Sequence, residues 1–465
     1  MPCGSGYARS HVHGEHTVDA RRILLVAAPM TVGPKARLID GHFGAFMRDR
    51  PGFLTHCARE YGDIVPLRFG PKRLLLISHP DFAQELLVDN DRHMAKPYVL
   101  STSRVRLDTP PNNAADIWRR PLLAQTVFHR SRMDGYGDIM VATTERMLDN
   151  WRAGEPRDVL NDMTRLAYQI VTRTLFGVDS AHQADAVGAA LGVVMNAFVG
   201  RLMTLFLVPE QLPTPGNLRL RRALRQLDEI AEDVMQRGRE APGGAAGLMA
   251  LAPDVAGDAE SEARLRDEAM TFLLAGHETV ALTLTWMWWL LAQHPAVEQR
   301  LGDELDIVLG ERSPTAADVP QLNYTRAVVS ESLRLYPPIW AMARTTTKDC
   351  AIGGQELPTG TNLVVSQWVI QRDPRFYADP DAFQPERWEN GLAKTLPRCA
   401  FFPFGGGARG CIGSGFAMIE ATLLLATIAR RFRLAQAAGP AVTPLATITL
   451  RPASPVIMTP RPRNV

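Results

Sequence analysis

Cysteine is scarce in this sequence, and its few cysteines form no recognisable pattern. The five cysteines among 465 residues are odd in number and widely spaced, and no two of them form a C-x-x-C pair. Neither a disulfide framework nor a zinc knuckle is therefore indicated. A reducing compartment fits this usage best, and we expect a cytoplasmic protein.

Long apolar runs and a strong excess of one charge are missing as well. The one strongly apolar run near the N-terminus, residues 23–32, is interrupted by Pro29 and is about half the length that a bilayer span needs. Residues 21–28 faintly resemble a signal peptide but lack a cleavage pattern. The formal net charge of +2 gives no argument for nucleic-acid binding. We expect neither a membrane span nor a nucleic-acid partner.

No linker rich in glycine, serine or proline divides the chain into separately patterned blocks. We therefore predict one large domain over residues 51–465, preceded by a poorly patterned extension over residues 1–50. Alternating segments at 64–69 and 73–77 predict a hairpin. Helical spacing dominates elsewhere, and residues 262–293, apolar nearly all round, predict a helix that crosses the interior. Residues 201–225 predict a helix, loop and helix that cover a site.

The most informative motif is the run from Phe404 to Gly413, FGGGARGCIG, which places Cys411 directly before a predicted helix over residues 415–431. The positive end of a helix and the backbone N–H groups of the turn stabilise a thiolate there. Glycines let the backbone approach a flat macrocycle, and Phe404 can cover the sulfur. The simpler alternative is a buried structural cysteine in a capping loop.

This run resembles the cytochrome P450 signature F-x-x-G-x-R-x-C-x-G at every fixed position, and Phe416, Ala417 and Glu420 continue it as in that family. The resemblance extends from about Phe53 to the C-terminus. It implies the cytochrome P450 fold, mainly α with a small β-sheet lobe. It also implies haem b with Cys411 as the axial iron ligand. The residues it places beside the haem are Phe404, Arg409 and Gly413, with Arg409 at a propionate.

Two further strings resemble the structural cluster of the same family. Glu331 and Arg334 stand three residues apart on a predicted helix and can pair. Alone, such a pair is typical of any surface helix. The string ESLRLYPP around it and the string PERW around Arg387 resemble the family's three-residue polar cluster. We expect Glu331, Arg334 and Arg387 to support the structure near the haem and to take no part in chemistry.

The string AGHET on the predicted central helix resembles the oxygen-binding kink of the family. Small residues such as Ala275 would leave room for dioxygen, while Thr279 and Glu278 would serve oxygen activation and proton delivery. The simpler alternative is a threonine bonded to its own helix and a glutamate paired with an arginine. We expect His277, on the adjacent and outward face of this helix, to be a packing or surface residue without a function, and Leu274 to line the substrate pocket.

Arg344 stands where family members carry an arginine that pairs with a haem propionate. The preceding segment is expected to face the substrate through Ile339, Trp340 and Met342. The clearest departure lies around Trp118, where the family usually has a basic residue four positions later and this chain has Leu122. Trp118 and one of Arg119 or Arg120 remain candidate propionate ligands.

The resemblance implies a monooxygenase that inserts one atom of O2 into an apolar small molecule. No FMN or NADPH module fits into the chain, so electrons would come from NAD(P)H through a separate ferredoxin or flavodoxin with its reductase. Arginines 119, 130, 132 and 398 could dock such an acidic partner.

The alternatives are a peroxide-dependent haem-thiolate enzyme and a haem-binding sensor. Glu278 and Thr279 argue against the first, and the apolar lid over residues 201–225, which favours a substrate tunnel, argues against the second. For the substrate we favour a terpenoid from secondary metabolism, with a fatty acid or polyketide next.

Overall fold

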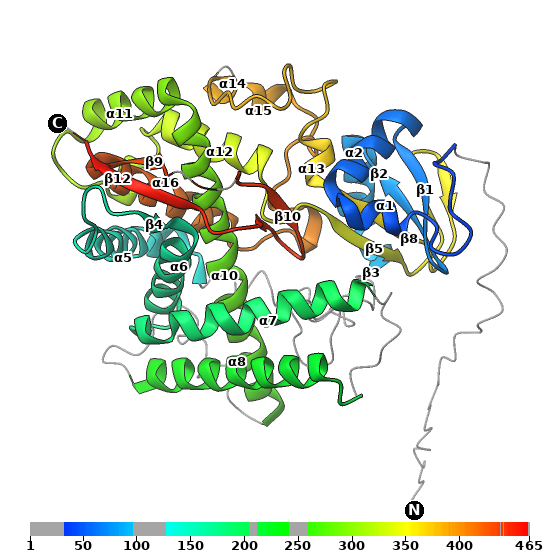
Figure 1. Ribbon diagram of the computed structural model, residues 1–465, viewed down its shortest axis with the longest axis horizontal. Coiled ribbons are helices and arrows are strands. Elements are labelled where there is room, and N and C mark those ends of the chain that lie inside the picture. The colour runs from blue at the N-terminus through cyan, green and yellow to red at the C-terminus, as the bar shows by residue number, and fades with distance from the viewer. Residues whose placement is uncertain are drawn as a thin grey trace, which may run out of the picture.

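The computed structural model describes residues 32–95, 127–203, 212–240, 259–389, 391–437, 439 and 441–463. Helices form one large part of the molecule, and a small sheet lobe lies beside them (Figure 1). The longer helices are α2 (Arg50–Tyr61), α5 (Arg130–Leu148), α6 (Val159–Leu175), α7 (Ala184–Met203), α8 (Pro215–Glu240), α10 (Ala259–Gln293), α11 (Pro295–Leu309), α12 (Asn323–Leu335) and α16 (Ser414–Arg431). The expected mainly α fold with a small sheet is confirmed.

The central helix α10 passes between the other helices, as its apolar sequence predicts. It packs most closely against α6, where Gly276 permits the approach, because a Cβ at that position would lie 3.0 Å from Val171. Trp286 and Trp288 are fully buried in its second half. The same interior contains α12 and α16, so the helix after Cys411 is anchored in the main apolar core.

The main sheet has five strands in the order β1-β2-β8-β5-β3, of which only the β2 and β8 pair is parallel. Gly70 turns the predicted hairpin with a φ of 55°, a conformation that suits glycine. The strands are β1 (Ile64–Phe69), β2 (Lys72–Ile77), β3 (Met94–Ala95), β5 (Met342–Thr346) and β8 (Asn362–Val365). Short helices α1 (Phe43–Arg48), α3 (Pro80–Gln84) and α13 (Gln367–Ile370) accompany this lobe.

Smaller sheets complete the fold. A three-stranded sheet joins β4 (Arg157–Asp158), β12 (Ile457–Pro462) and β9 (Phe432–Gln436), and two hairpins pair β6 (Cys350–Ile352) with β7 (Gln355–Leu357) and β10 (Pro444–Ala446) with β11 (Leu450–Pro452). Short helices α14 (Glu386–Glu389) and α15 (Leu392–Thr395) lie in the segment before Cys411. The β10–β11 hairpin reaches the central helix, because the Trp286 indole donates to the Leu450 carbonyl at 2.9 Å.

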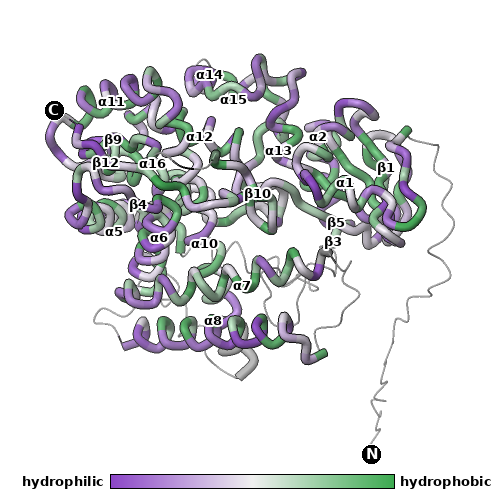
Figure 2. The backbone as a smooth tube through the Cα atoms, in the orientation of Figure 1, coloured by the Kyte–Doolittle hydropathy of each residue, from purple (hydrophilic) through white to green (hydrophobic). Residues whose placement is uncertain are grey.

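Helices α7 and α8 lie side by side and flank the expected covering segment, whose residues 204–211 are outside the described part (Figure 1). Charged and apolar residues alternate along α8, whereas α7 is more apolar (Figure 2). Residues 181–201 are long and apolar enough to cross a membrane, with 33% of that window buried. A helix that covers an apolar cavity can be equally long and apolar, so its length and composition are weak evidence for a membrane span.

Candidate active site

Cys411 ends a tight loop that lies against a one-turn π-helix at Glu85–Asp89. Its backbone N–H donates to the Phe404 carbonyl at 2.9 Å, which closes the loop. Gly407 has a φ of 68°, and a Cβ there would come within 2.0 Å of the Leu87 carbonyl oxygen. Only glycine permits that approach. Gly413 lies directly before α16, where a Cβ would be 3.6 Å from Phe128.

The Cys411 thiol faces a cavity of about 530 Å³. The side chain is accessible, unlike those of Cys57, Cys350 and Cys399, which are buried. The enclosing protein nevertheless raises the pKa of the Cys411 thiol by desolvation, and a hydrogen bond from the Gly413 backbone only partly opposes this. A bound metal cation would supply the missing stabilisation of the thiolate. No group of three or more histidine, cysteine or acidic residues that could hold a metal occurs among the described residues.

On α10, Thr279 also belongs to the cavity wall. Its hydroxyl donates to the carbonyl of Ala275 at 2.7 Å, and its own carbonyl accepts from Thr283 at 2.8 Å. Ala275 is exposed on this stretch of the helix. The simpler sequence alternative, a threonine bonded back to its own helix, therefore describes this conformation. The same hydroxyl is available to a ligand if it rotates away from that carbonyl.

Glu278 is not among the residues of this wall. The side chain is 6% exposed, and its Oε1 accepts from the Thr449 hydroxyl at 2.8 Å and lies 3.4 Å from Nη2 of Arg451. Both partners belong to the region of the β10–β11 hairpin, 171 residues or more along the chain. The sequence offered no signal for this contact, because the partners share neither a motif nor a helix face with Glu278.

His277 does not have the outward orientation expected from the sequence, and that expectation is wrong. The side chain is fully buried because α6 covers it, with the Tyr168 ring 5.7 Å away and edge-on. Burial lowers the pKa of His277 and favours the neutral imidazole. Leu274 also departs from its expected place. It is 3% exposed and lies in the apolar cluster of α6, α7, α8 and α10, not in the cavity wall.

Two arginines approach the cavity from the sheet side. Arg344 on β5 is 5% exposed, and the only described hydrogen bond of its side chain is from Nη1 to the Ala343 carbonyl at 2.9 Å. Its Nε has no partner among the described residues. Burial and the nearby Arg409 lower the pKa of Arg344 to about 10. Arg409 pairs with Asp91 and donates to the Met94 carbonyl at 2.9 Å.

These features fit a haem bound at this site. A buried guanidinium with an unpartnered Nε requires an anion, and a haem propionate would supply one to Arg344. The thiol of Cys411 lies in the same wall, with Phe404 beside it in the loop. Trp118, Arg119 and Arg120 lie outside the described residues.

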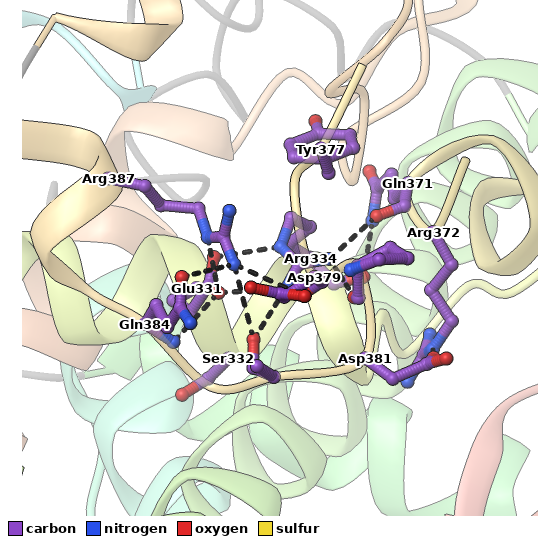
Figure 3. A network of polar contacts seen from close by, with 12 residues as sticks. Glu331, Ser332, Arg334, Gln371, Arg372, Tyr377, Asp379, Asp381, Gln384 and Arg387 are labelled. Carbon is purple, nitrogen blue, oxygen red and sulfur yellow. Dashed lines mark hydrogen bonds and ion pairs between the residues drawn. The ribbon is translucent and has the colours of Figure 1, made fainter. Parts of the chain in front are cut away.

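Behind the loop, a buried polar cluster ties α12 to the segment that leads to Cys411 (Figure 3). Glu331 and Arg334 have no exposed surface and form a bidentate pair at 2.7 and 2.8 Å. Arg387 donates from Nε to the same carboxylate at 3.0 Å. Arg334 also donates to the carbonyls of Gln371, Pro380 and Ala382. The structure thus brings together the three residues that the two separate strings nominated.

The rest of the cavity wall is largely apolar. Ile339, Trp340 and Met342 belong to it, as the sequence predicts. The Trp340 indole is held by a 2.9 Å bond to the Thr447 carbonyl. Sequence reasoning missed the contributions of the sheet lobe, of α7 before Arg201 and of the turn after β10, which include Phe46, Phe69, Phe198, Thr447 and Ile448. Leu220 of α8 also lines the cavity, and it belongs to the segment 201–225 that was expected to cover a site. Apolar residues at these positions look like ordinary core until the fold brings them together.

Comparisons with known proteins identify the family of this chain. The family model described as cytochrome P450 matches residues 33–459, a match that begins inside the segment set aside as an extension. Cyclooctatin synthase of Streptomyces melanosporofaciens is 36% identical, covering 93% of this chain and 96% of that protein. Cyclooctat-9-en-7-ol 5-monooxygenase of the same species is 34% identical, covering 88% and 91%. Pentalenene oxygenase of Streptomyces avermitilis is 34% identical, covering 90% and 94%. The chain therefore belongs to the cytochrome P450 family and is a haem-thiolate monooxygenase.

Proposed function

We propose that this monooxygenase oxidises a terpenoid held in the cavity beside Cys411. The observation that supports the proposal is the largely apolar cavity, whose lining includes both Thr279 and Cys411. Its volume of about 530 Å³ would be shared by haem and substrate, because Cys411, Arg344 and Arg409 line the same cavity as Ile339 and Met342. Relatives over nearly the whole chain oxidise terpenoids, which favours this class over a fatty acid or polyketide.

Haem b would be held by Cys411 through the iron, by Arg344 and Arg409 through the propionates, and by Phe404 next to the sulfur. When bound there, haem supplies the redox chemistry by which one oxygen atom of O2 is placed on substrate carbon and the other leaves as water. Ile339, Met342 and the turn at Thr447 would orient the hydrocarbon, and the apolar wall would exclude water.

Protons would be handled by two residues of α10. Thr279 would release its bond to the Ala275 carbonyl and donate towards the cavity. Glu278 would return protons to it from the side of Arg451 and Thr449, which hold the carboxylate away from the apolar wall. This division keeps a charged group out of the substrate space, where desolvation would penalise it.

Electrons would come from NAD(P)H through a separate ferredoxin or flavodoxin and its reductase. Of the candidate docking arginines, Arg398 is exposed in the segment before the cysteine loop. Arg132 interacts with the Tyr136 hydroxyl, Arg119 lies outside the described residues, and only the backbone of Arg130 is described. If R398E leaves the association rate with an acidic ferredoxin and its salt dependence unchanged, this docking role is wrong.

The test of the function is a substrate screen with the haem-loaded protein. Terpenoids, fatty acids and polyketides of matched size are titrated while the spectral shift of the bound haem is recorded, and the binders are then incubated with O2, a ferredoxin and its reductase. We expect terpenoids to shift the spectrum and to give an oxygenated product. Product from a fatty acid and none from any terpenoid would overturn the proposal, and product only with added peroxide would favour the peroxide-dependent alternative.

A further inference from the structure

The charged side chains that line the cavity are all arginines, of which Arg409 pairs with Asp91. The described residues of the cavity wall include four arginines and no aspartate or glutamate; the arginines are Arg50, Arg201, Arg344 and Arg409. Two of these have a role already, because Arg344 and Arg409 are suited to the two propionates of haem. The other two come from α2 and α7, away from the cysteine loop in the chain. Cations in an apolar enclosure create a potential that favours an anionic ligand.

Arg50 is the better defined of these two arginines. The side chain is 8% exposed, and its Nη1 donates to the carbonyl of Ala446. Its Nε has no partner among the described residues, which also provide no carboxylate in ion-pair contact with it. The adjacent Asp49 is engaged elsewhere, because it caps α2 by accepting from the Gly52 N–H at 3.0 Å. A guanidinium with five N–H donors is thus left with one described acceptor.

The position of Arg50 at the start of α2 adds to this cost. The first turn of a helix carries a partial positive charge, so a cation there is less favourable than an anion. Burial also lowers the pKa of Arg50, although arginine stays protonated in proteins. Apolar packing alone does not explain an arginine at this position. A buried charge of this kind requires a counter-charge.

The residues around Arg50 indicate the chemical class of the ligand that carries the counter-charge. Phe46, Phe69 and Leu74 belong to the same wall and offer only apolar contacts. The carbonyl that it binds, on Ala446, directly precedes the cavity-lining turn at Thr447 and Ile448. In Figure 1 this turn follows β10, which lies between the sheet lobe and the central helices. A ligand bound to Arg50 would therefore extend along an apolar surface formed by the sheet lobe and by the turn after β10.

We propose that Arg50 forms an anion subsite which binds the carboxylate of a mainly hydrocarbon monoacid, so that the substrate is a terpenoid carboxylic acid. The identity of the hydrocarbon body rests on the proposed function; the carboxylate rests on Arg50. A neutral terpene would leave the guanidinium without its counter-charge. A diphosphate would carry more negative charge into an apolar wall than Arg50 and Arg201 offset, and its desolvation would be costly.

The experiment compares acids with their methyl esters, which have nearly the same shape and no charge. Abietic acid and methyl abietate represent the terpenoid body, and palmitic acid and methyl palmitate represent a linear body. Dissociation constants for the haem-loaded protein are measured by calorimetry and by the spectral shift. We expect at least one acid to bind about 10-fold to 100-fold more tightly than its ester. R50M should abolish that ratio by weakening the acid, R50K should retain part of it, and R48M should leave it unchanged, because Arg48 is exposed and outside the wall.

The wild-type comparison needs no variant, so it stays decisive even if R50M fails to fold. If neither acid binds more tightly than its ester, the subsite is wrong, whichever ester binds. If R50M folds, retains haem and keeps the full acid preference, the subsite is wrong as well. An acid preference confined to the linear pair would support the subsite and count against the terpenoid body. Tight and equal binding of abietic acid and methyl abietate, with no acid preference in either pair, would support the terpenoid body and count against the subsite.

Discussion

Replacing Glu331 with glutamine alters one oxygen of a carboxylate on which five hydrogen bonds converge. Glu331 accepts from Arg334 at 2.7 and 2.8 Å, from Arg387 at 3.0 Å, from the Trp388 indole at 2.8 Å and from the Gln384 backbone at 3.0 Å. In E331Q an amide NH2 would face some of these donors, and the fully buried Arg334 would lose its counter-charge. Loss of one partner of a buried ion pair costs about 3–5 kcal/mol.

The matched control is E389Q, because Glu389 pairs with the half-exposed Arg300 at 2.7 Å. That surface pair contributes about 0.2–1 kcal/mol. Urea unfolding of the haem-loaded proteins, followed by tryptophan fluorescence and circular dichroism, measures both variants, and the two probes must agree before a free energy is assigned. We expect a clear fall in the midpoint for E331Q and little change for E389Q. Equal midpoints for the two variants would refute the claim that the buried cluster supports the fold.

Four further outcomes test other parts of the site. C411A should lose the red-shifted Soret band of the reduced carbon monoxide complex, and a variant that keeps this band would contradict the ligand assignment. R344M should release haem to apomyoglobin about 10-fold or more faster, since a charged hydrogen bond is lost; an unchanged rate would remove Arg344 from the propionate. T449V and R451M should lower the amount of product formed per reductant consumed, because each removes a partner of the Glu278 carboxylate. T449S keeps the hydroxyl and should stay close to wild type. The same yield per reductant in all three variants would show that the β10–β11 hairpin has no part in proton delivery. Burial raises the pKa of Glu420 well above its usual value, so its contribution to stability is present below the unfolded pKa of about 4.3 and is lost as pH rises. E420Q should therefore be more stable than wild type at pH 8 in thermal unfolding, with the difference shrinking towards pH 4, and a difference independent of pH would show that Glu420 stays ionised in the fold.

Local spacing in the sequence was enough to predict several parts of the molecule. The ten-residue run ending at Gly413 identified Cys411, because a loop and the helix that follows it are set by neighbouring residues. The apolar pattern of residues 262–293 predicted the central helix, whose observed start at Ala259 lies three residues earlier. Glu331 and Arg334 share a helix turn, so their pairing follows from helical geometry. Arg387 joined them only through the family resemblance.

Contacts between distant segments could not be predicted in this way. The Glu278 carboxylate meets Thr449 across 171 residues, and Arg50 meets Ala446 across 396. His277 was misplaced because the face of a helix that is apolar nearly all round depends on its neighbours, here α6 with Tyr168.

The sequence by itself determined the fold class, the cysteine loop, the central helix and the family. The cysteine loop and the central helix follow from periodicity and from residues close in the chain, where covalent geometry limits the possible arrangements. The fold class and the family follow from the resemblance of the motifs to the cytochrome P450 signature. The tertiary structure alone decided that Arg50 and Arg201 also line the cavity, which partners hold Glu278 and which side chains of the sheet lobe and of the turn after β10 join the wall. Each of these depends on packing between elements hundreds of residues apart, for which no local pattern exists.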